Sequence, residues 1–181
     1  ACLVRETDLS SFSIFKRGTI DEMINFFVRT VSTKTGPGQR NVVKEAGNIC
    51  HCFTTPDGLT TAVITDEEYE SKYAWACAKV AQKNFLEKVP EGWQQSKEDS
   101  IVDVPAIKQM LVDWQTPEKM DKVAAIQSDL DNVKGVLCKS IDQLLERGEK
   151  LETIVEKSED LSASSKTFLW QAKKQNACCK S

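Results

Sequence analysis

The side chains best able to do chemistry are one imidazole between two thiols and a pair of thiols near the end of the chain. His51, the only histidine, stands between Cys50 and Cys52, and Cys178 and Cys179 are adjacent. Successive residues of a strand face opposite sides, so a strand here would point His51 away from both neighbouring thiols. Zinc needs three or four converging ligands, and a cysteine nucleophile needs a base within reach. The pattern therefore predicts no metal site, no cofactor and no catalytic centre.

The two terminal thiols indicate a different chemistry. Terminal cysteines are acceptors for lipids, and stable anchoring to a bilayer requires two lipid signals. The alternative is a frayed tail in which the thiols are incidental. Lys180 follows Cys179 at a position where a prenylation box has an aliphatic residue, so the pattern is met only in part. We predict that residues 176–181 form a lipidation-type tail.

A single cation in a long apolar seam is the third feature. From residue 123 to residue 172, steps of three and four residues alternate, which is the period of about 3.5 of helices that supercoil around partners. Arg147 lies at the centre of this seam, where a leucine is expected. A buried lone cation is costly unless partners supply acceptors, and polar seam residues fix register and partner number. A chance arginine on an exposed edge is the alternative. The apolar seam positions are Val123, Ile126, Leu130, Val133, Leu137, Leu144, Leu151, Ile154, Leu161, Phe168 and Ala172.

Composition excludes several classes of function. The net charge is −3 and no basic stripe is present, so nucleic acid is not an expected partner. No run of about 18 apolar residues occurs, so no transmembrane helix is expected. Seven scattered cysteines, an odd number, fit a reducing cytosol better than a disulfide framework. Phosphate-binding and hydrolase motifs do not occur, and we expect a protein that is not an enzyme.

Residues 1–114 have the pattern of a small α+β domain with one sheet. Thr19 and Glu22 form a capping box that predicts the start of a helix, and Asp57-Gly58 is a strong hairpin signal. The chain begins without Met, and we expect an incomplete N-terminus. The predicted elements are a strand at 1–7, a helix from 19, strands at 42–44, 49–54 and 59–65, and helices at 67–86, 105–114 and from 117 onwards.

Phe26 does not fit the apolar face of the first helix. That face is formed by residues such as Ile20, Ile24 and Val31, and Phe26 lies well over about 90° from its centre. One interpretation is a ring at the margin of the face, packed on a neighbouring loop. The other is a docking point for another element, such as the long helix of this chain.

Three stretches of the sequence resemble the lipid-anchored longin R-SNAREs of the YKT type, which are related to synaptobrevins. They are Leu-Leu-Glu-Arg-Gly-Glu-Lys-Leu at 144–151, Lys-Lys-Gln-Asn-Ala-Cys-Cys at 173–179 and Ser-Ser-Phe-Ser-Ile-Phe at 10–15. The resemblance implies a profilin-like longin domain at 1–114, with a single antiparallel sheet and flanking helices. It implies that 115–175 form one long coiled-coil R-SNARE helix. The family has a further strand before residue 1, so the first strand of the domain is expected to be missing.

The resemblance also implies roles for the unusual residues. Arg147 would be the central ionic layer, meeting three glutamines of Q-SNARE helices in a parallel four-helix bundle. Phe26 would lie on the longin surface that docks the unassembled SNARE helix in a closed state. Cys178 would be palmitoylated and Cys179 prenylated.

The function implied is membrane fusion in ER–Golgi, Golgi and endosomal or vacuolar transport. The protein would be cytosolic and also attached by lipid to the cytosolic face of those membranes. A soluble coiled-coil adaptor or tether without fusion activity is the alternative.

Overall fold

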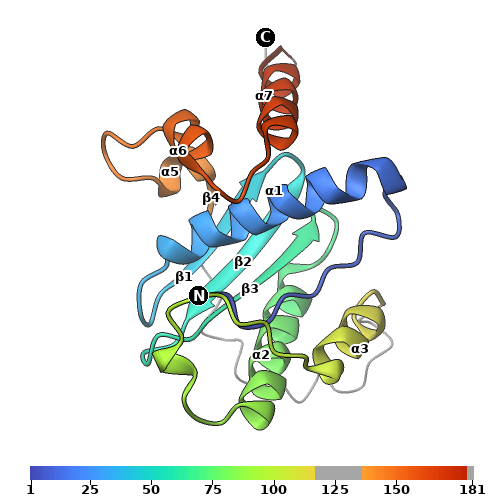
Figure 1. Ribbon diagram of the computed structural model, residues 1–181, viewed down its shortest axis with the longest axis vertical. Coiled ribbons are helices and arrows are strands. Elements are labelled where there is room, and N and C mark those ends of the chain that lie inside the picture. The colour runs from blue at the N-terminus through green and yellow to red at the C-terminus, as the bar shows by residue number, and fades with distance from the viewer. Residues whose placement is uncertain (117–135, 179–181) are drawn as a thin grey trace.

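The structure is a computed structural model that describes residues 1–116 and 136–178, the residues from 172 onwards as helix backbone alone. In these ranges a four-stranded sheet in the order β3-β2-β1-β4 lies between helices on both faces (Figure 1). The elements are α1 (Ile14–Thr33), β1 (Arg40–Glu45), β2 (Asn48–Thr54), β3 (Thr60–Asp66), α2 (Ser71–Lys88), the 3-10 helix η1 (Trp93–Gln95), α3 (Pro105–Asp113), β4 (Cys138–Ser140), α5 (Ile141–Leu144), α6 (Leu151–Lys157) and α7 (Ala163–Cys178).

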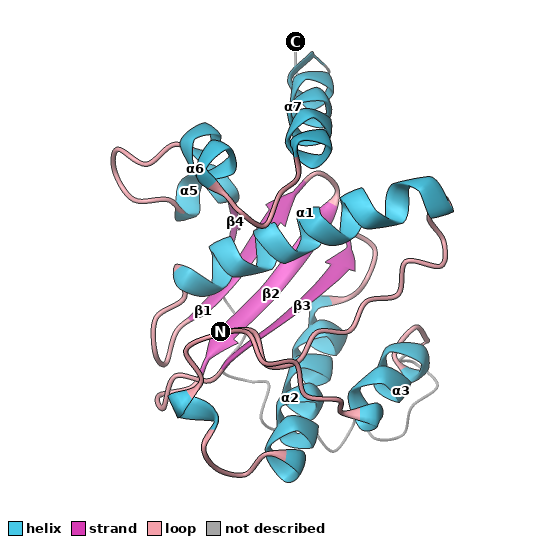
Figure 2. Cartoon of the chain, in the orientation of Figure 1, coloured by secondary structure: helices cyan, strands magenta, loops and turns pink. Residues whose placement is uncertain are grey.

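The sheet is built on an antiparallel meander of β1, β2 and β3 (Figure 2). Asp57 and Gly58 lie in the turn between β2 and β3, as the sequence predicts, and Gly58 has a φ of 96° that favours glycine. The alternation of the central strand sends its side chains to two different cores. Cys50 and Cys52 lie in the core under α1, whereas Phe53 lies in the core under α2.

The core under α2 is the larger and holds most of the tryptophans. Trp75 and Phe85 of α2 are buried in it, together with Trp93 of η1 and Met110 of α3. Pro105 occupies the first turn of α3, where its missing N–H has no helical acceptor to lose. The buried residues of this core all belong to the predicted N-terminal domain, and Val136 packs against them as a partly buried neighbour.

The core under α1 combines the N-terminal domain with the C-terminal segment. Phe26 and Val31 of α1 share it with Ile141, Leu151 and Val155. Figure 1 shows α5 and α6, in orange, beside one end of α1, and α7, in red, beginning near α1 and projecting away from it. The C-terminal segment is thus folded onto the domain through this second core.

Three predictions of local structure are wrong. Residues 1–7 form no strand, and Leu3 O instead accepts from Val102 N at 2.8 Å. The first helix begins at Ile14, so Thr19 and Glu22 lie inside it and form no capping box. The sheet is mixed and not wholly antiparallel, because β4 pairs in parallel with β1. The α+β class and the single sheet are confirmed.

The C-terminal segment is not one continuous helix in the described range 136–178. It contains a strand and three helices, α5, α6 and α7, with non-helical residues at 145–150 and 158–162. A narrow apolar seam needs partner helices to cover it. In the lone chain, Leu151 and Leu161 of the seam are instead buried in the core under α1, and the segment is interrupted at two points.

Candidate site: the surface that docks the C-terminal segment

His51 and the neighbouring thiols of Cys50 and Cys52 have a structural role. His51 is fully buried, its Nε2 lies 3.0 Å from Ser71 Oγ, and its ring meets Trp75 edge-to-face at 5.4 Å. Burial lowers the pKa of His51 to about 4. Burial also raises the pKa of Cys50 well above its ordinary value, which makes that thiol unreactive. Across the described residues, no three potential metal ligands converge.

Phe26 lies in the core that the domain shares with the C-terminal segment. Its side chain is only 5% exposed, although its position on α1 is off the predicted apolar face. It belongs to the cluster that includes Leu151, Val155 and Leu161, each of them buried. Phe26 therefore lies in a core that combines the sheet with the C-terminal segment, and its role as a docking point stays a prediction.

The seam residues divide into three groups. Leu151 and Leu161 are buried in the core under α1, and Leu144 and Ile154 are partly buried against it. Leu137 and Phe168 are exposed, Leu137 by 78%. Outside the described residues or side chains lie Val123, Ile126, Leu130, Val133 and Ala172, and also the tail cysteines Cys178 and Cys179.

The start of the docked segment is held by backbone pairing. β4 adds to the free edge of β1, with Val42 opposite Cys138 and Lys44 opposite Ser140. Ser140 then caps α5: its Oγ accepts from Gln143 N at 3.3 Å, and Gln143 Oε1 accepts from Ser140 N at 2.9 Å. The next residue, Ile141, is 2% exposed and enters the core under α1.

Arg147 lies in the exposed loop between α5 and α6. The acidic residues beside it are tied to the end of α1: Lys34 Nζ lies 3.5 Å from Glu146 Oε1 and 2.7 Å from Glu149 Oε2. The hydrogen bond from Lys34 lowers the pKa of Glu149, and the carboxylate in turn raises the pKa of Lys34. The proposed ionic-layer residue therefore faces solvent while its neighbours hold the loop in place.

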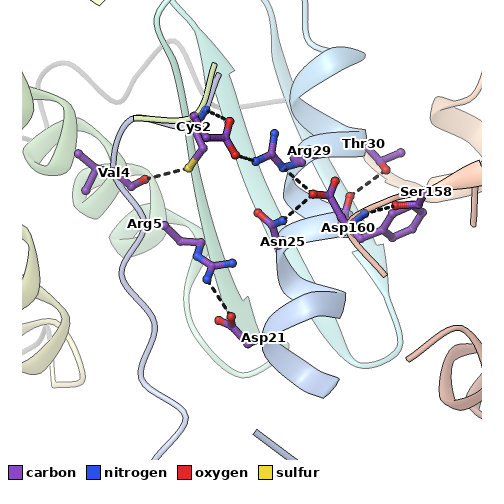
Figure 3. A network of polar contacts seen from close by, with 11 residues as sticks. Cys2, Val4, Arg5, Asp21, Asn25, Arg29, Thr30, Ser158 and Asp160 are labelled. Atoms are coloured by element: carbon purple, nitrogen blue, oxygen red, sulfur yellow. Dashed lines mark hydrogen bonds and ion pairs between the residues drawn. The ribbon is translucent and has the colours of Figure 1, made fainter. Parts of the chain in front are cut away.

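A polar network joins α1 to the loop before α7 (Figure 3). Arg29 contacts Asp99 on one side, and its Nε lies 3.4 Å from Asp160 Oδ1 on the other. Asn25 Nδ2 donates to the same Asp160 oxygen at 3.1 Å. The backbone N–H of Cys2 donates to Asp99 at 2.8 Å and, with Arg29, lowers the pKa of that carboxyl. Three separate parts of the chain therefore meet at Arg29.

Glu22 forms a second polar link to the same loop. One of its carboxylate oxygens accepts from Ser162 N at 2.7 Å, which lowers the pKa of Glu22. Ser162 Oγ in turn accepts from Ser165 N at 3.3 Å. The start of α7 is thus fastened to the middle of α1.

Sequence reasoning missed several residues of this surface. Ile141 and Val155 are buried but lie off the seam, and Lys34, Arg29 and Asp160 showed no local pattern. Val155 directly follows the seam residue Ile154, so a stripe one residue wider would have included it. The contacts of Asn25 with Asp160 and of Lys34 with Glu149 join residues 135 and 115 positions apart, and local spacing carries no such signal.

Comparison with known proteins finds similarity to one family along nearly the whole chain. The family profile described as "Regulated-SNARE-like domain" matches residues 9–104, and the synaptobrevin profile matches residues 122–180. The chain is 40% identical over 179 residues to "Synaptobrevin homolog YKT6" of Yarrowia lipolytica, covering 98% of this chain and 90% of that protein. It is 38% identical over 176 residues to the protein of the same name from Saccharomyces cerevisiae, covering 95% and 87%.

A plant relative shows the same extent of similarity. "VAMP-like protein YKT61" of Arabidopsis thaliana is 37% identical over 177 residues, covering 98% of this chain and 88% of its own length. No helix within the described residues is both long and apolar enough to cross a bilayer. The two profiles and the near-full-length identity carry one conclusion: the chain belongs to the YKT-type longin R-SNAREs of the synaptobrevin family, whose role is in vesicle trafficking.

Proposed function

We propose that this protein is an R-SNARE that drives fusion of transport vesicles by zippering with three Q-SNARE helices, and that its longin domain holds the SNARE segment closed beforehand. The transport steps proposed are those between the ER, Golgi and endosomal or vacuolar compartments. The 115–175 segment supplies the coiled-coil helix, and residues 1–114 supply the domain that covers it.

One observation carries the closed state: Phe26 shares a buried core with the seam residues Leu151 and Leu161. The same two leucines are needed in a helical bundle, because seam residues form its interior. They cannot be buried against α1 and against partner helices at once. Docking on the domain and assembly with Q-SNAREs are therefore mutually exclusive uses of one apolar stripe.

Arg147 fits the ionic layer of the proposed bundle. A guanidinium presents five donors and suits several neutral oxygens, such as three glutamine carbonyls. Arg147 is exposed in the closed chain, so the closed state does not bear the cost of burying a charge. Assembly would bury it only when acceptors are present, which favours Q-SNARE partners over arbitrary helices.

Membrane attachment is proposed to occur through lipid on Cys178 and Cys179. Two adjacent thiols satisfy the need for two signals, since a single acyl chain binds a bilayer only marginally. The lipid would place the protein on the cytosolic face of Golgi, ER, vesicle and endosomal membranes. Zippering toward that end would draw two membranes together, because a helix of about 60 residues spans roughly 90 Å.

The test of the closed state is the substitution Phe26→Glu in the full chain. Loss of a buried ring costs about 3 to 5 kcal/mol, and a buried carboxylate adds to that cost. We expect amide hydrogen exchange to rise across residues 138–161 and assembly with Q-SNARE helices to become faster.

Phe15→Glu is the matched control, because Phe15 is on the same helix but 94% exposed. It should leave exchange at 138–161 unchanged. Equal exchange in the wild type and the Phe26→Glu chain would remove Phe26 from the mechanism.

A further inference from the structure

The loop that carries Arg147 is a tight turn with a strict backbone requirement. Glu149 N donates to Glu146 O at 3.0 Å, which closes a four-residue turn with Arg147 second and Gly148 third. Gly148 has a φ of 96°, whereas Arg147 is not among the residues with positive φ. A positive φ at the third position alone is the signature of a type II turn, in which that position takes Gly or, less well, Asn.

The requirement for glycine comes from the backbone and not from space. A Cβ built on Gly148 would meet no atom within 4 Å. An L-residue other than Asn is therefore disfavoured by its own φ and not by a neighbour. A substitution here would act on the shape of the turn without creating a clash in the core.

The turn is fastened to the domain at both of its acidic residues. Lys34, the residue that ends α1, reaches the carboxylates of Glu146 and Glu149. Glu149 Oε2 also accepts from Glu146 N at 2.8 Å, inside the turn itself. The turn thus sets the direction of the chain after Arg147, which brings Leu151 into the core under α1.

Gly148 cannot keep its positive φ in a continuous helix. A helix needs a φ near −63° at every position. Leu145 and Lys150, which flank the turn, have φ of −69° and −125°, values open to any residue. Straightening the segment also changes Leu145 and Lys150, whose ψ values of 150° and 135° are extended, but within 145–150 Gly148 is the residue that must leave a left-handed conformation.

We propose that Gly148 is a conformational switch residue beside Arg147: its left-handed state permits the closed chain, and its right-handed state belongs to the assembled helix. This inference rests on the proposed function, because the straight form is the one that Q-SNARE helices would select. Glycine is the residue that reaches both states most readily. Its low helix propensity also keeps the unpaired segment from straightening by itself.

The test is Gly148→Ala in the full chain, measured first without any partner. Alanine is disfavoured at positive φ and favoured in a helix, and each effect is worth about fivefold in the equilibrium. We expect the population of the undocked segment to rise about 25-fold, seen as faster hydrogen exchange at 138–161 and along β1. Exchange in β2 and α2 should stay as in the wild type, which shows that the domain is folded.

Two variants serve as controls. Gly148→Asn keeps a side chain that tolerates positive φ, so it should shift exchange far less than Gly148→Ala. Gly18→Ala lies within α1, where a Cβ likewise meets nothing within 4 Å. It should raise helix stability without changing exchange at 138–161.

The outcomes separate this inference from the proposed function. Equal exchange at 138–161 in the wild type and the Gly148→Ala chain would overturn the switch, whatever Q-SNARE helices do. Faster exchange together with faster assembly on Q-SNARE helices supports both proposals. Faster exchange without any assembly supports the switch and rejects the proposed function.

Discussion

At the scale of single residues, His51 and Arg147 show how environment decides the role of an ionisable side chain. His51 is the only histidine and is fully buried between the sheet and Trp75. Its Nδ1 has no hydrogen-bond partner within the described structure, so protonation would place an unpaired charge in the core. Arg147 is exposed, and its charge costs nothing until partners bury it.

The buried His51 predicts a pH dependence of stability. Its folded pKa of about 4 lies below the ordinary value of 6.5, so the unfolded chain binds the extra proton first. The free energy of unfolding should therefore fall as the pH drops from about 6.5 to about 4, by on the order of 3 kcal/mol in total. Urea melts across this range measure the slope.

His51→Gln is the comparison for that slope, because it keeps polarity without titrating. The difference in slope between the two chains isolates the histidine from the carboxylates. Parallel slopes between pH 6.5 and pH 4 would show that His51 does not stay neutral in the folded chain.

At the scale of elements, α1 serves two surfaces at once. Phe26 and Val31 lie in one core that contains residues of the sheet, such as Val43, and residues of the C-terminal segment, such as Leu151. Polar residues on the same helix, Glu22, Asn25 and Arg29, bind the loop before α7. Glu22 does not cap a helix together with Thr19, because its carboxylate accepts a hydrogen bond from the backbone N–H of Ser162.

The Arg29–Asp160 contact predicts a salt-sensitive step at this loop. Both side chains are about one-third exposed, at 33% and 35%, so the pair contributes less than about 1 kcal/mol. Asp160→Asn should raise exchange at the start of α7 by about two- to fivefold in low salt. Added salt should raise exchange in the wild type and have little effect on the variant.

Lys157→Gln is a matched control for that experiment, because Lys157 is an exposed charge at the end of α6. It should leave exchange at α7 unchanged. A wild-type chain that shows no response to salt would exclude the ion pair as a holding contact.

At the scale of the whole molecule, two arrangements compete for one apolar seam. In the lone chain, the domain covers Leu151 and Leu161, and the segment is bent at the turn around Arg147. In the proposed bundle, the seam is straight and Arg147 is inside. The balance depends on partner helices, because the bundle gains burial that the domain alone does not supply.

Arg147→Leu tests whether Arg147 selects the partner helices of the proposed bundle. The lone chain should change in stability by less than about 0.5 kcal/mol, because the position is exposed. Mixed with Q-SNARE helices, the variant should still assemble but should no longer discriminate them from other coiled-coil helices. Thermal melting of the mixtures measures this loss.

Lys150→Leu, exposed and off the seam, should keep the discrimination. Full discrimination by the Arg147→Leu chain would rule out an ionic layer at this position.

The sequence by itself determined the features that depend on local spacing and residue chemistry. Strand alternation placed His51 on the other face of the strand from Cys50 and Cys52. Asp57-Gly58 predicted the hairpin. The seam period predicted that 123–172 packs against partner helices. These signals are read within a few turns or strands, where backbone geometry links spacing to direction.

Only the tertiary structure decided what covers the seam in the lone chain. The bends at 145–150 and 158–162, the strand β4 beside β1 and the burial of Phe26 all arise from contacts between distant parts of the sequence. A seam of period about 3.5 predicts a helix only when partners are present. Without partners, burial of apolar side chains against α1 is lower in free energy than a straight helix with its seam exposed to water. The segment is therefore bent.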